Sequence, residues 1–174
     1  MNSVIRLARP DEIEALVAVE ESADRAFAAI PELAWIANGG GPDIEPSLAP
    51  PYAALIQLGS VWVATENDIL IGFVATQAVG RDLHVWELAV AADHQQKGVG
   101  RRLMETAEQW ARARTLDSLT LTTFRSVPWN APFYSRLGFE AVENGAPAAH
   151  LDRVLADEAR RGLPDRCAMR LTLR

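Results

Sequence analysis

The segment from residue 83 to residue 114 constrains the fold of this chain more than any other part of the sequence. Residues 83–90 are mostly apolar and are typical of a β-strand, and residues 99–114 carry apolar side chains spaced by three and four, as in an amphipathic helix. The connection between them contains Gln95-Gln96-Lys97-Gly98-Val99-Gly100-Arg101-Arg102. Glycines at 98 and 100 allow a tight turn and a close approach of the backbone to a ligand. The segment therefore predicts a strand, a tight loop and a helix in that order.

The loop before this helix has the properties of an anion-binding site. The first amides of a helix have no intrahelical partner, and the helix dipole makes this end positive. Lys97, Arg101 and Arg102 add three cationic side chains, although the whole chain has a net charge of −6 at pH 7. A phosphate or pyrophosphate group is the ligand that this arrangement implies.

Two familiar phosphate-binding motifs do not fit the loop. A nucleotide P-loop has two glycines separated by four residues and then Lys followed by Ser or Thr, and this pattern is absent. A dinucleotide-binding turn needs a third glycine at position 103, where this sequence has Leu103. The loop is therefore expected to bind a phosphate compound of another class.

The rest of the sequence predicts one α/β domain over residues 1–174. Strands are expected at residues 4–7, 61–65, 69–79, 83–90, 118–123, 139–142 and 166–173. Helices are expected from residue 10 to about residue 27 and at residues 52–58, 99–114, 128–137 and 148–161. This order favours a mixed sheet with helices on both faces.

Composition excludes several classes of protein. The 174 residues are 49% hydrophobic and 23% charged, which is the balance of a folded globular domain. An excess of 23 acidic over 17 basic residues argues against general nucleic-acid binding. Cys167 is the only cysteine, which excludes an internal disulfide and a metal site built from several cysteines, and we expect no metal. The longest apolar run, residues 69–75, is too short for a membrane span, so we expect a cytoplasmic protein without membrane contact.

Three motifs together resemble the GCN5-related N-acetyltransferase (GNAT) family. Gln95-x-x-Gly98-x-Gly100 is similar to the loop that binds the pyrophosphate of acyl-CoA in that family, and Leu88-Ala89-Val90 is similar to the end of its central strand. Asn130-Ala131-Pro132-Phe133-Tyr134-x-x-x-Gly138-Phe139 resembles its later helix-to-strand segment. The likeness covers residues 4–142, and the closing strand at 166–173 also fits. It implies a mixed α/β sheet that splays at its centre, between residues 83–90 and 118–123, with helices on both faces.

The resemblance implies acetyl transfer from acetyl-CoA, as cosubstrate, to a primary amine that attacks directly in a ternary complex. The pantetheine arm would pair with the backbone of the central strand, as a ligand added to a sheet edge. The residues implied in cofactor binding are Leu88, Ala89, Val90, Gln95, Gln96, Lys97, Gly98, Val99, Gly100, Arg101 and Asn130. For Asn130, a helix start without a ligand is an equal alternative.

The catalytic candidates are Tyr134, His84 and Glu87. By resemblance, Tyr134 matches the tyrosine that faces the CoA sulfur and would protonate or stabilise the departing thiolate. The same resemblance makes the Leu88 amide the donor to the oxyanion. His84 lies six residues before Val90, where some family members carry a general base, and a structural histidine is an equal alternative. Glu87 is the alternative base, or else the partner of an arginine.

The resemblance also implies that residues 28–59, which include Glu32, Asp43 and Glu45, form most of the acceptor pocket. These acids favour a cationic small amine, although ordinary loop acids are the alternative for each. Three other functions stay open: acetylation of a protein or peptide amine, a non-catalytic acyl-CoA sensor, and a structural domain with a vestigial loop. The extra helix at residues 148–161 either covers the acceptor site, packs on the sheet or forms a homodimer contact.

Overall fold

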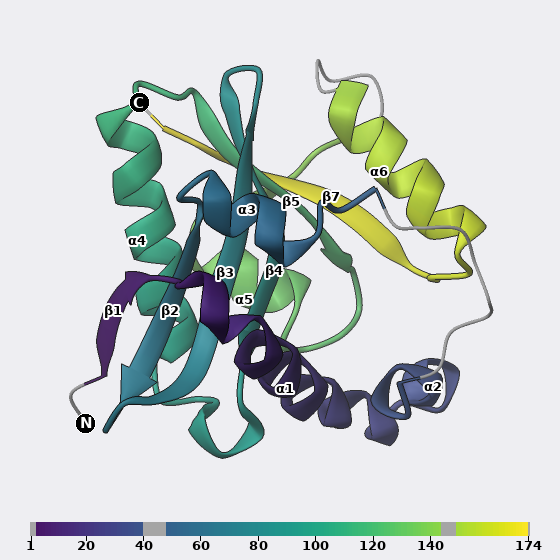
Figure 1. The fold of residues 1–174 in the computed structure, drawn as a ribbon. Helices are drawn as coiled ribbons and strands as arrows, with labels where there is room; N and C mark the ends of the chain where they lie inside the picture. Colours follow the sequence, from purple (N-terminus) through teal and green to yellow (C-terminus); the bar gives the residue numbers. More distant parts are fainter. Residues whose placement is uncertain (1–2, 40–47, 144–148, 174) are drawn as a thin grey trace. The chain divides into compact units, whose positions relative to one another are not determined.

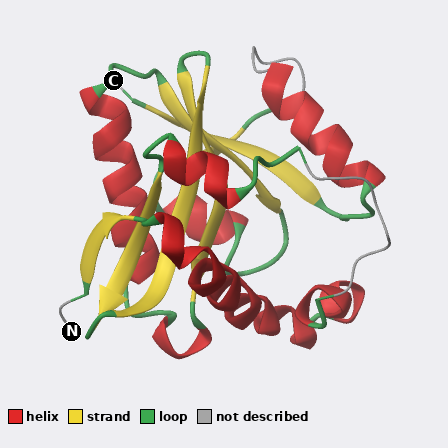
Figure 2. Cartoon of the chain, in the orientation of Figure 1, coloured by secondary structure: helices red, strands yellow, loops and turns green. Residues whose placement is uncertain are grey.

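The computed structural model describes residues 3–39, 48–143 and 149–173 (Figure 1). Seven strands are hydrogen-bonded in the order β1-β2-β3-β4-β5-β7-β6. The strands are β1 (Val4–Leu7), β2 (Val61–Glu66), β3 (Ile69–Val79), β4 (Asp82–Val90), β5 (Ser118–Phe124), β6 (Glu140–Ala141) and β7 (Arg166–Thr172). The main helices are α1 (Ile13–Asp24), α2 (Ala34–Ala37), α3 (Tyr52–Gln57), α4 (Val99–Ala113), α5 (Ala131–Arg136) and α6 (Ala149–Arg160) (Figure 2).

The chain divides into two compact units. The first contains residues 1–43, 50–76 and 87–107, and the second contains residues 44–49, 77–86 and 108–174. The boundary passes through β4, so that Asp82–Trp86 belong to the second unit and Glu87–Val90 to the first. The candidate site residues are consequently divided between the two units, and each unit is described by itself.

In the first unit, an antiparallel hairpin carries the core. β2 pairs with β1 on one side and with β3 on the other, and both pairings are antiparallel. Asn67 and Asp68 make the hairpin turn with φ angles of 51° and 63°, a conformation that these two residue types tolerate. The fully buried side chains in this unit include Leu16, Leu55, Val63 and Phe73, which come from α1, α3, β2 and β3. Burial of these apolar side chains stabilises the contact between the helices and the hairpin.

Gly72 lets β3 approach the start of α4. A Cβ atom at residue 72 would lie 3.1 Å from the carbonyl oxygen of Ala89, 3.2 Å from Val99 Cγ1 and 3.3 Å from Leu103 Cδ1. A larger residue would therefore push the first turn of α4 away from the sheet. This contact fixes where the loop before α4 begins and ends.

In the second unit, β5 is the central strand. Asp82–Val85 pair in parallel with Ser118–Leu121, so that His84 lies opposite Thr120. β5 also pairs antiparallel with β7, and β7 pairs antiparallel with β6.

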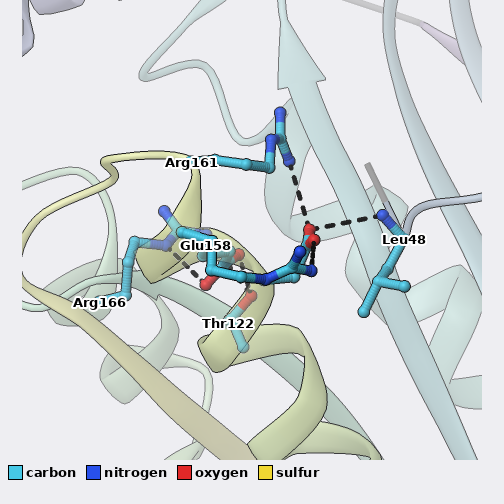
Figure 3. Close-up of polar contacts among 7 residues, drawn as sticks. Leu48, Thr122, Glu158, Arg161 and Arg166 are labelled. Carbon is cyan, nitrogen blue, oxygen red and sulfur yellow. Dashed lines mark hydrogen bonds and ion pairs between the residues drawn. The ribbon is translucent and has the colours of Figure 1, made fainter. Parts of the chain in front are cut away.

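Two carboxylates hold α6 in this unit. Glu158 accepts hydrogen bonds from Thr122 Oγ1 at 2.7 Å and from Arg166 at 2.7 and 3.0 Å (Figure 3). Asp157 lies within 3.8 Å of Arg161 and accepts a hydrogen bond from the amide of Leu48 at 3.4 Å. The buried Leu151 and Val154 add apolar contacts on the same helix. The helix expected at residues 148–161 is thus present as α6, attached to β5 and β7.

The mixed α/β fold expected from the sequence is confirmed, with helices flanking the sheet. One helix was expected to start at residue 128, but it begins at Ala131 because Pro132 occupies its first turn and residues 128–130 form a turn. The strand expected at 139–142 is limited to two residues. Short helical turns at Arg25–Ala29 and Pro31–Leu33, together with α2, occupy a segment in which the sequence predicted no element after about residue 27. None of the helices in the described ranges is long and apolar enough to cross a membrane.

Candidate active site

The loop between β4 and α4 is held by hydrogen bonds to three other segments. The side-chain amide of Gln95 donates to the carbonyl of Val90 at 3.0 Å, which folds the loop back onto the end of β4. The amide of Ala91 donates to Ile71 of β3 at 2.9 Å, and the amide of Ala92 donates to Ser22 Oγ at 3.1 Å. The side chain of Gln95, expected to bind the cofactor, therefore also has a structural role.

The backbone of this loop has the geometry that an anion requires. Gln96 and Gly98 adopt φ angles of 60° and 81°, and a Cβ atom at Gly98 would meet nothing within 4 Å. The first hydrogen bond that enters α4 joins the amide of Arg102 to the carbonyl of Gly98 at 3.1 Å. The amides of Val99, Gly100 and Arg101 lie before this bond and, as first-turn amides, have no intrahelical acceptor. This end of α4 can therefore donate several hydrogen bonds to one phosphate group.

The three cationic side chains at the loop are not equivalent. Arg102 donates to the hydroxyl and carbonyl oxygens of Ser3, so its guanidinium holds the N-terminal segment. Arg101 is exposed and pairs with Glu105 at 3.1 Å along α4. Lys97 is exposed within the loop itself. Lys97 and Arg101 are consequently the side chains placed to neutralise a bound phosphate.

A cluster of acidic side chains surrounds Tyr52 in the first unit. The hydroxyl of Tyr52 donates to Glu20 Oε2 at 2.5 Å, and its ring packs edge-on against Phe73. Burial, followed by the charges of Glu87 and Glu20, raises the pKa of Tyr52 above its ordinary range. Burial and neighbouring glutamates also raise the pKa of Asp24 to about 6. This Tyr52 cluster, consisting of Tyr52, Glu20, Asp24 and Glu87, is a region of concentrated negative charge.

His84 is buried in the second unit and is bonded through one ring nitrogen. Its Nδ1 lies 3.1 Å from Thr120 Oγ1, and its ring packs edge-on against Trp86 at 4.5 Å between centroids. Burial, and to a smaller degree the charge of His150, lowers the pKa of His84 to about 3. Since Nδ1 is taken by Thr120, only Nε2 can reach a further partner. His84 is therefore neutral at physiological pH, and its Nε2 is the ring nitrogen that can form a further hydrogen bond.

Tyr134 is buried on α5 between two phenylalanine rings. Its ring centroid lies 5.1 Å from that of Phe133 and 5.7 Å from that of Phe139, both in edge-on geometry. The carbonyl of Asn130 accepts the first hydrogen bonds of α5, from the amides of Phe133 and Tyr134. The side chain of Asn130 makes no capping hydrogen bond, so its amide group is not used to start the helix.

The structure separates the candidate residues by unit. The first unit holds the loop, residues 87–90 and the Tyr52 cluster, and the second holds His84, Tyr134 and Asn130. Glu32 is exposed on a short helical turn, and Asp43 and Glu45 lie outside the described residues. Cys167 is buried on β7 and burial raises its pKa, as expected for an unreactive thiol.

Sequence reasoning missed Glu20, Asp24 and Thr120. Glu20 interrupts the apolar stripe of α1, and this irregularity was the one local signal that it has a partner elsewhere. Thr120 carries no local signal, because a threonine in a strand has an ordinary role in a sheet.

Residues 57–141, a little under half of the chain, match the model of the acetyltransferase (GNAT) domain. This match supports acyl-CoA-dependent N-acetyltransferase activity, with acetyl-CoA as the cosubstrate.

Solved structures with the same fold include three named enzymes. PaiA N-acetyltransferase from Thermoplasma acidophilum, crystallised with coenzyme A, aligns over 99% of this chain and 100% of its own, with 16% identity and a TM-score of 0.70. The ribosomal-protein-S18-alanine N-acetyltransferase from Escherichia coli aligns over 98% and 94%, with 20% identity and a TM-score of 0.63. N-acetylglutamate synthase from Neisseria gonorrhoeae aligns over 100% of this chain and 36% of its own, with 15% identity and a TM-score of 0.68.

Proposed function

We propose that this enzyme acetylates the primary amine of a small cationic molecule. The observation that carries the proposal is the Tyr52 cluster, in which Glu20 is held by the Tyr52 hydroxyl and lies with Asp24 and Glu87 in one unit. Three carboxylates around a half-buried aromatic ring attract an ammonium group and disfavour an anionic acceptor. Acetylation of a protein or peptide amine is the alternative within the class.

The loop before α4 is proposed to bind the pyrophosphate of acetyl-CoA. The amides of residues 96–101 would donate to its oxygens, and Lys97 and Arg101 would neutralise its charge. The backbone of Leu88, Ala89 and Val90 would pair with the pantetheine arm, and the side-chain amide of Asn130 would contact the same arm. The free side chain of Asn130 at the start of α5 supports this last assignment.

The free amine, rather than the ammonium, is the form that attacks. Transfer of a proton from an alkylammonium with a pKa of about 10 to His84, with a pKa of about 3, would cost roughly 10 kcal/mol at 1.36 kcal/mol per pKa unit. His84 therefore does not strip the bound ammonium. We assign it the later step, in which the nitrogen has formed its bond to the acetyl carbon and has become acidic. There Nε2 of His84 accepts a proton, directly or through water.

Tyr134 is proposed to assist the departure of the thiolate. A phenol with an ordinary pKa of about 10 donates a hydrogen bond readily to a sulfur whose conjugate acid has a pKa of about 8.5. Its position between Phe133 and Phe139 limits the motion of the ring. The Leu88 amide is proposed to donate to the oxyanion.

The decisive experiment measures thiol release from acetyl-CoA across a panel of amines at fixed pH. Small monocationic and dicationic amines should give the highest kcat/KM, above amino acids, acidic amines and peptides. A preference for peptide N-termini would instead favour the alternative acceptor. Tight binding of CoA without amine-dependent thiol release would contradict an enzymatic role and favour an acyl-CoA sensor.

A further inference from the structure

Four polar side chains in the second unit form a continuous series that ends at His84. Thr120 Oγ1 lies 3.1 Å from His84 Nδ1 and 3.1 Å from His150 Nε2. His150 Nδ1 in turn lies 4.0 Å from Asp82 Oδ2. His84 and Thr120 are fully buried, and His150 reaches them from α6. The series joins residues of three elements, β4, β5 and α6. No local sequence pattern predicts that these residues lie together.

The hydroxyl of Thr120 couples the two rings because it has only one proton. It can donate to one imidazole nitrogen, and it must then accept from the N–H of the other. If Thr120 donates to His150, then His84 carries its proton on Nδ1 and presents a bare Nε2. If Thr120 donates to His84, then His84 carries its proton on Nε2 and becomes a donor.

Asp82 decides between these two arrangements. A carboxylate at 4.0 Å favours a proton on His150 Nδ1 over a lone pair, because an N–H dipole points its positive end at the negative charge. Arg170 lies 3.5 Å from the same Oδ2 and Ser118 donates to Oδ1, and these two contacts hold the carboxylate in position. With the proton on Nδ1, Nε2 of His150 is an acceptor and takes the hydroxyl proton of Thr120.

We propose that Asp82, His150 and Thr120 are positioning residues that hold His84 with its proton on Nδ1, so that its Nε2 can accept a proton or hydrogen bond from the amine. The placement of the hydrogens follows from the residues around the series and does not depend on the reaction. The use of Nε2 rests on the role proposed for His84 above.

Protonation of His150 reverses the direction of the hydrogen bonds in the series. A charged imidazole has N–H groups on both nitrogens, so it donates to Thr120, and Thr120 must then donate to His84 Nδ1. His84 would move its proton to Nε2 and could no longer accept one there. Burial lowers the pKa of His150. Among the charged groups that face it, Asp82 favours its charged form, and Arg170 and Arg153 disfavour it. Acid should therefore inactivate His84 without charging it.

The direct test is ¹H–¹⁵N NMR of the full-length enzyme labelled at histidine, in which two-bond couplings report which nitrogen of each ring carries the proton. At pH 8 we expect His84 to be protonated on Nδ1, and acidification should move its proton to Nε2 as His150 becomes charged. Thr120→Ser should behave as the wild type because it keeps the hydroxyl. Thr120→Val should abolish the coupling between the two rings. A proton on Nε2 of His84 at pH 8, or an unchanged response in Thr120→Val, would overturn the proposal.

Kinetics separates the positioning role from a structural one. His150→Phe leaves Thr120 with His84 as its acceptor, so His84 should carry its proton on Nε2 at every pH and kcat should fall about tenfold. Thr120→Val should lower kcat to a similar degree, and Thr120→Ser should restore it, with melting temperatures checking that each variant is folded. If NMR shows the proposed tautomer but His84→Gln keeps full kcat, then the series stands and the catalytic role of His84 fails.

Discussion

The hydroxyl of Tyr52 on α3 donates to Glu20 on α1 at 2.5 Å, and this bond joins two helices that are separated by a long stretch of sequence. The bond fixes the carboxylate of Glu20 beside a half-buried ring, where Glu87 and Asp24 also contribute negative charge. The relationship places a polar and acidic centre in the unit that also contains the loop before α4, which is proposed to bind the cosubstrate. This acidic centre is the observation that supports a cationic amine as the acceptor.

Removal of charge from the Tyr52 cluster should weaken the binding of cationic acceptors. Glu87→Gln and Glu20→Gln should each raise KM for a cationic amine about tenfold, which corresponds to loss of about 1.4 kcal/mol of charge attraction. Glu14→Gln, at an exposed position in the first turn of α1, is the matched control and should leave KM unchanged. An equal effect of all three substitutions would show that the cluster does not contact the acceptor.

The two tyrosines of the chain should have different kinetic roles. Tyr134→Phe should lower kcat about a hundredfold at saturating substrates, as expected for loss of an acid that acts on the leaving group. Tyr52→Phe should mainly raise KM for the amine, because it releases Glu20 and leaves the leaving group untouched. Steady-state kinetics with both substrates varied distinguishes the two effects. Unchanged turnover in Tyr134→Phe would remove this residue from the mechanism.

Gly98 should be required for binding of the cosubstrate. Its φ of 81° is unfavourable for a residue with a side chain, so Gly98→Ala should distort the loop and raise KM for acetyl-CoA about tenfold. Gly80→Ala is the matched control, since Gly80 also has a positive φ, of 61°, with nothing within 4 Å of its Cβ position. Both variants should lose about 1 kcal/mol of stability, but Gly80→Ala should bind acetyl-CoA normally in a calorimetric titration. Weakened binding in both would assign the effect to stability alone.

Burial of neutral His84 should make the protein less stable in acid. Its pKa is about 3 in the folded state and 6.5 in an exposed chain, so the unfolded state takes up a proton first as the pH falls below 6.5. The contribution is complete above pH 6.5 and is lost toward pH 3. Urea unfolding should show about 2 kcal/mol of loss from this group between pH 7 and pH 5, with His150 acting in the same direction. His84→Gln should reduce the pH dependence, and an identical dependence in this variant would contradict the assignment.

Replacement of only one partner of the ion pair between Glu158 and Arg166 should lower the free energy of unfolding. Arg166→Leu would leave Glu158 buried without its cation, and we expect a loss of about 3 kcal/mol in the free energy of unfolding. The double variant with Glu158→Leu should recover most of that loss. Arg125→Leu, in an exposed pair with Asp165, is the control and should change stability by less than about 0.5 kcal/mol. A loss in the control as large as that in Arg166→Leu would rule out the role of burial.

Local patterns in the sequence were sufficient to predict most of the strands and helices and the tight loop before α4. Apolar side chains at helical spacing predicted α4, and glycines at 98 and 100 predicted the tight loop before it. The strand at residues 118–123 was predicted because Leu119 and Leu121 alternate with threonines, and the strand at residues 83–90 because a mostly apolar segment follows the turn at residues 80–82. These features depend on neighbours within a few residues, so they can be recognised without a tertiary structure.

The partners of the buried polar side chains were decided only by the tertiary structure. Glu20 and Tyr52 are 32 residues apart, His84 and Thr120 are 36 apart, and Thr120 and His150 are 30 apart. His84 meets Thr120 because β4 and β5 pair in one particular register, and His150 joins them because α6 docks on the same unit. Strand register and helix docking minimise the free energy of the whole core, and no periodicity in the sequence records which polar groups they bring together.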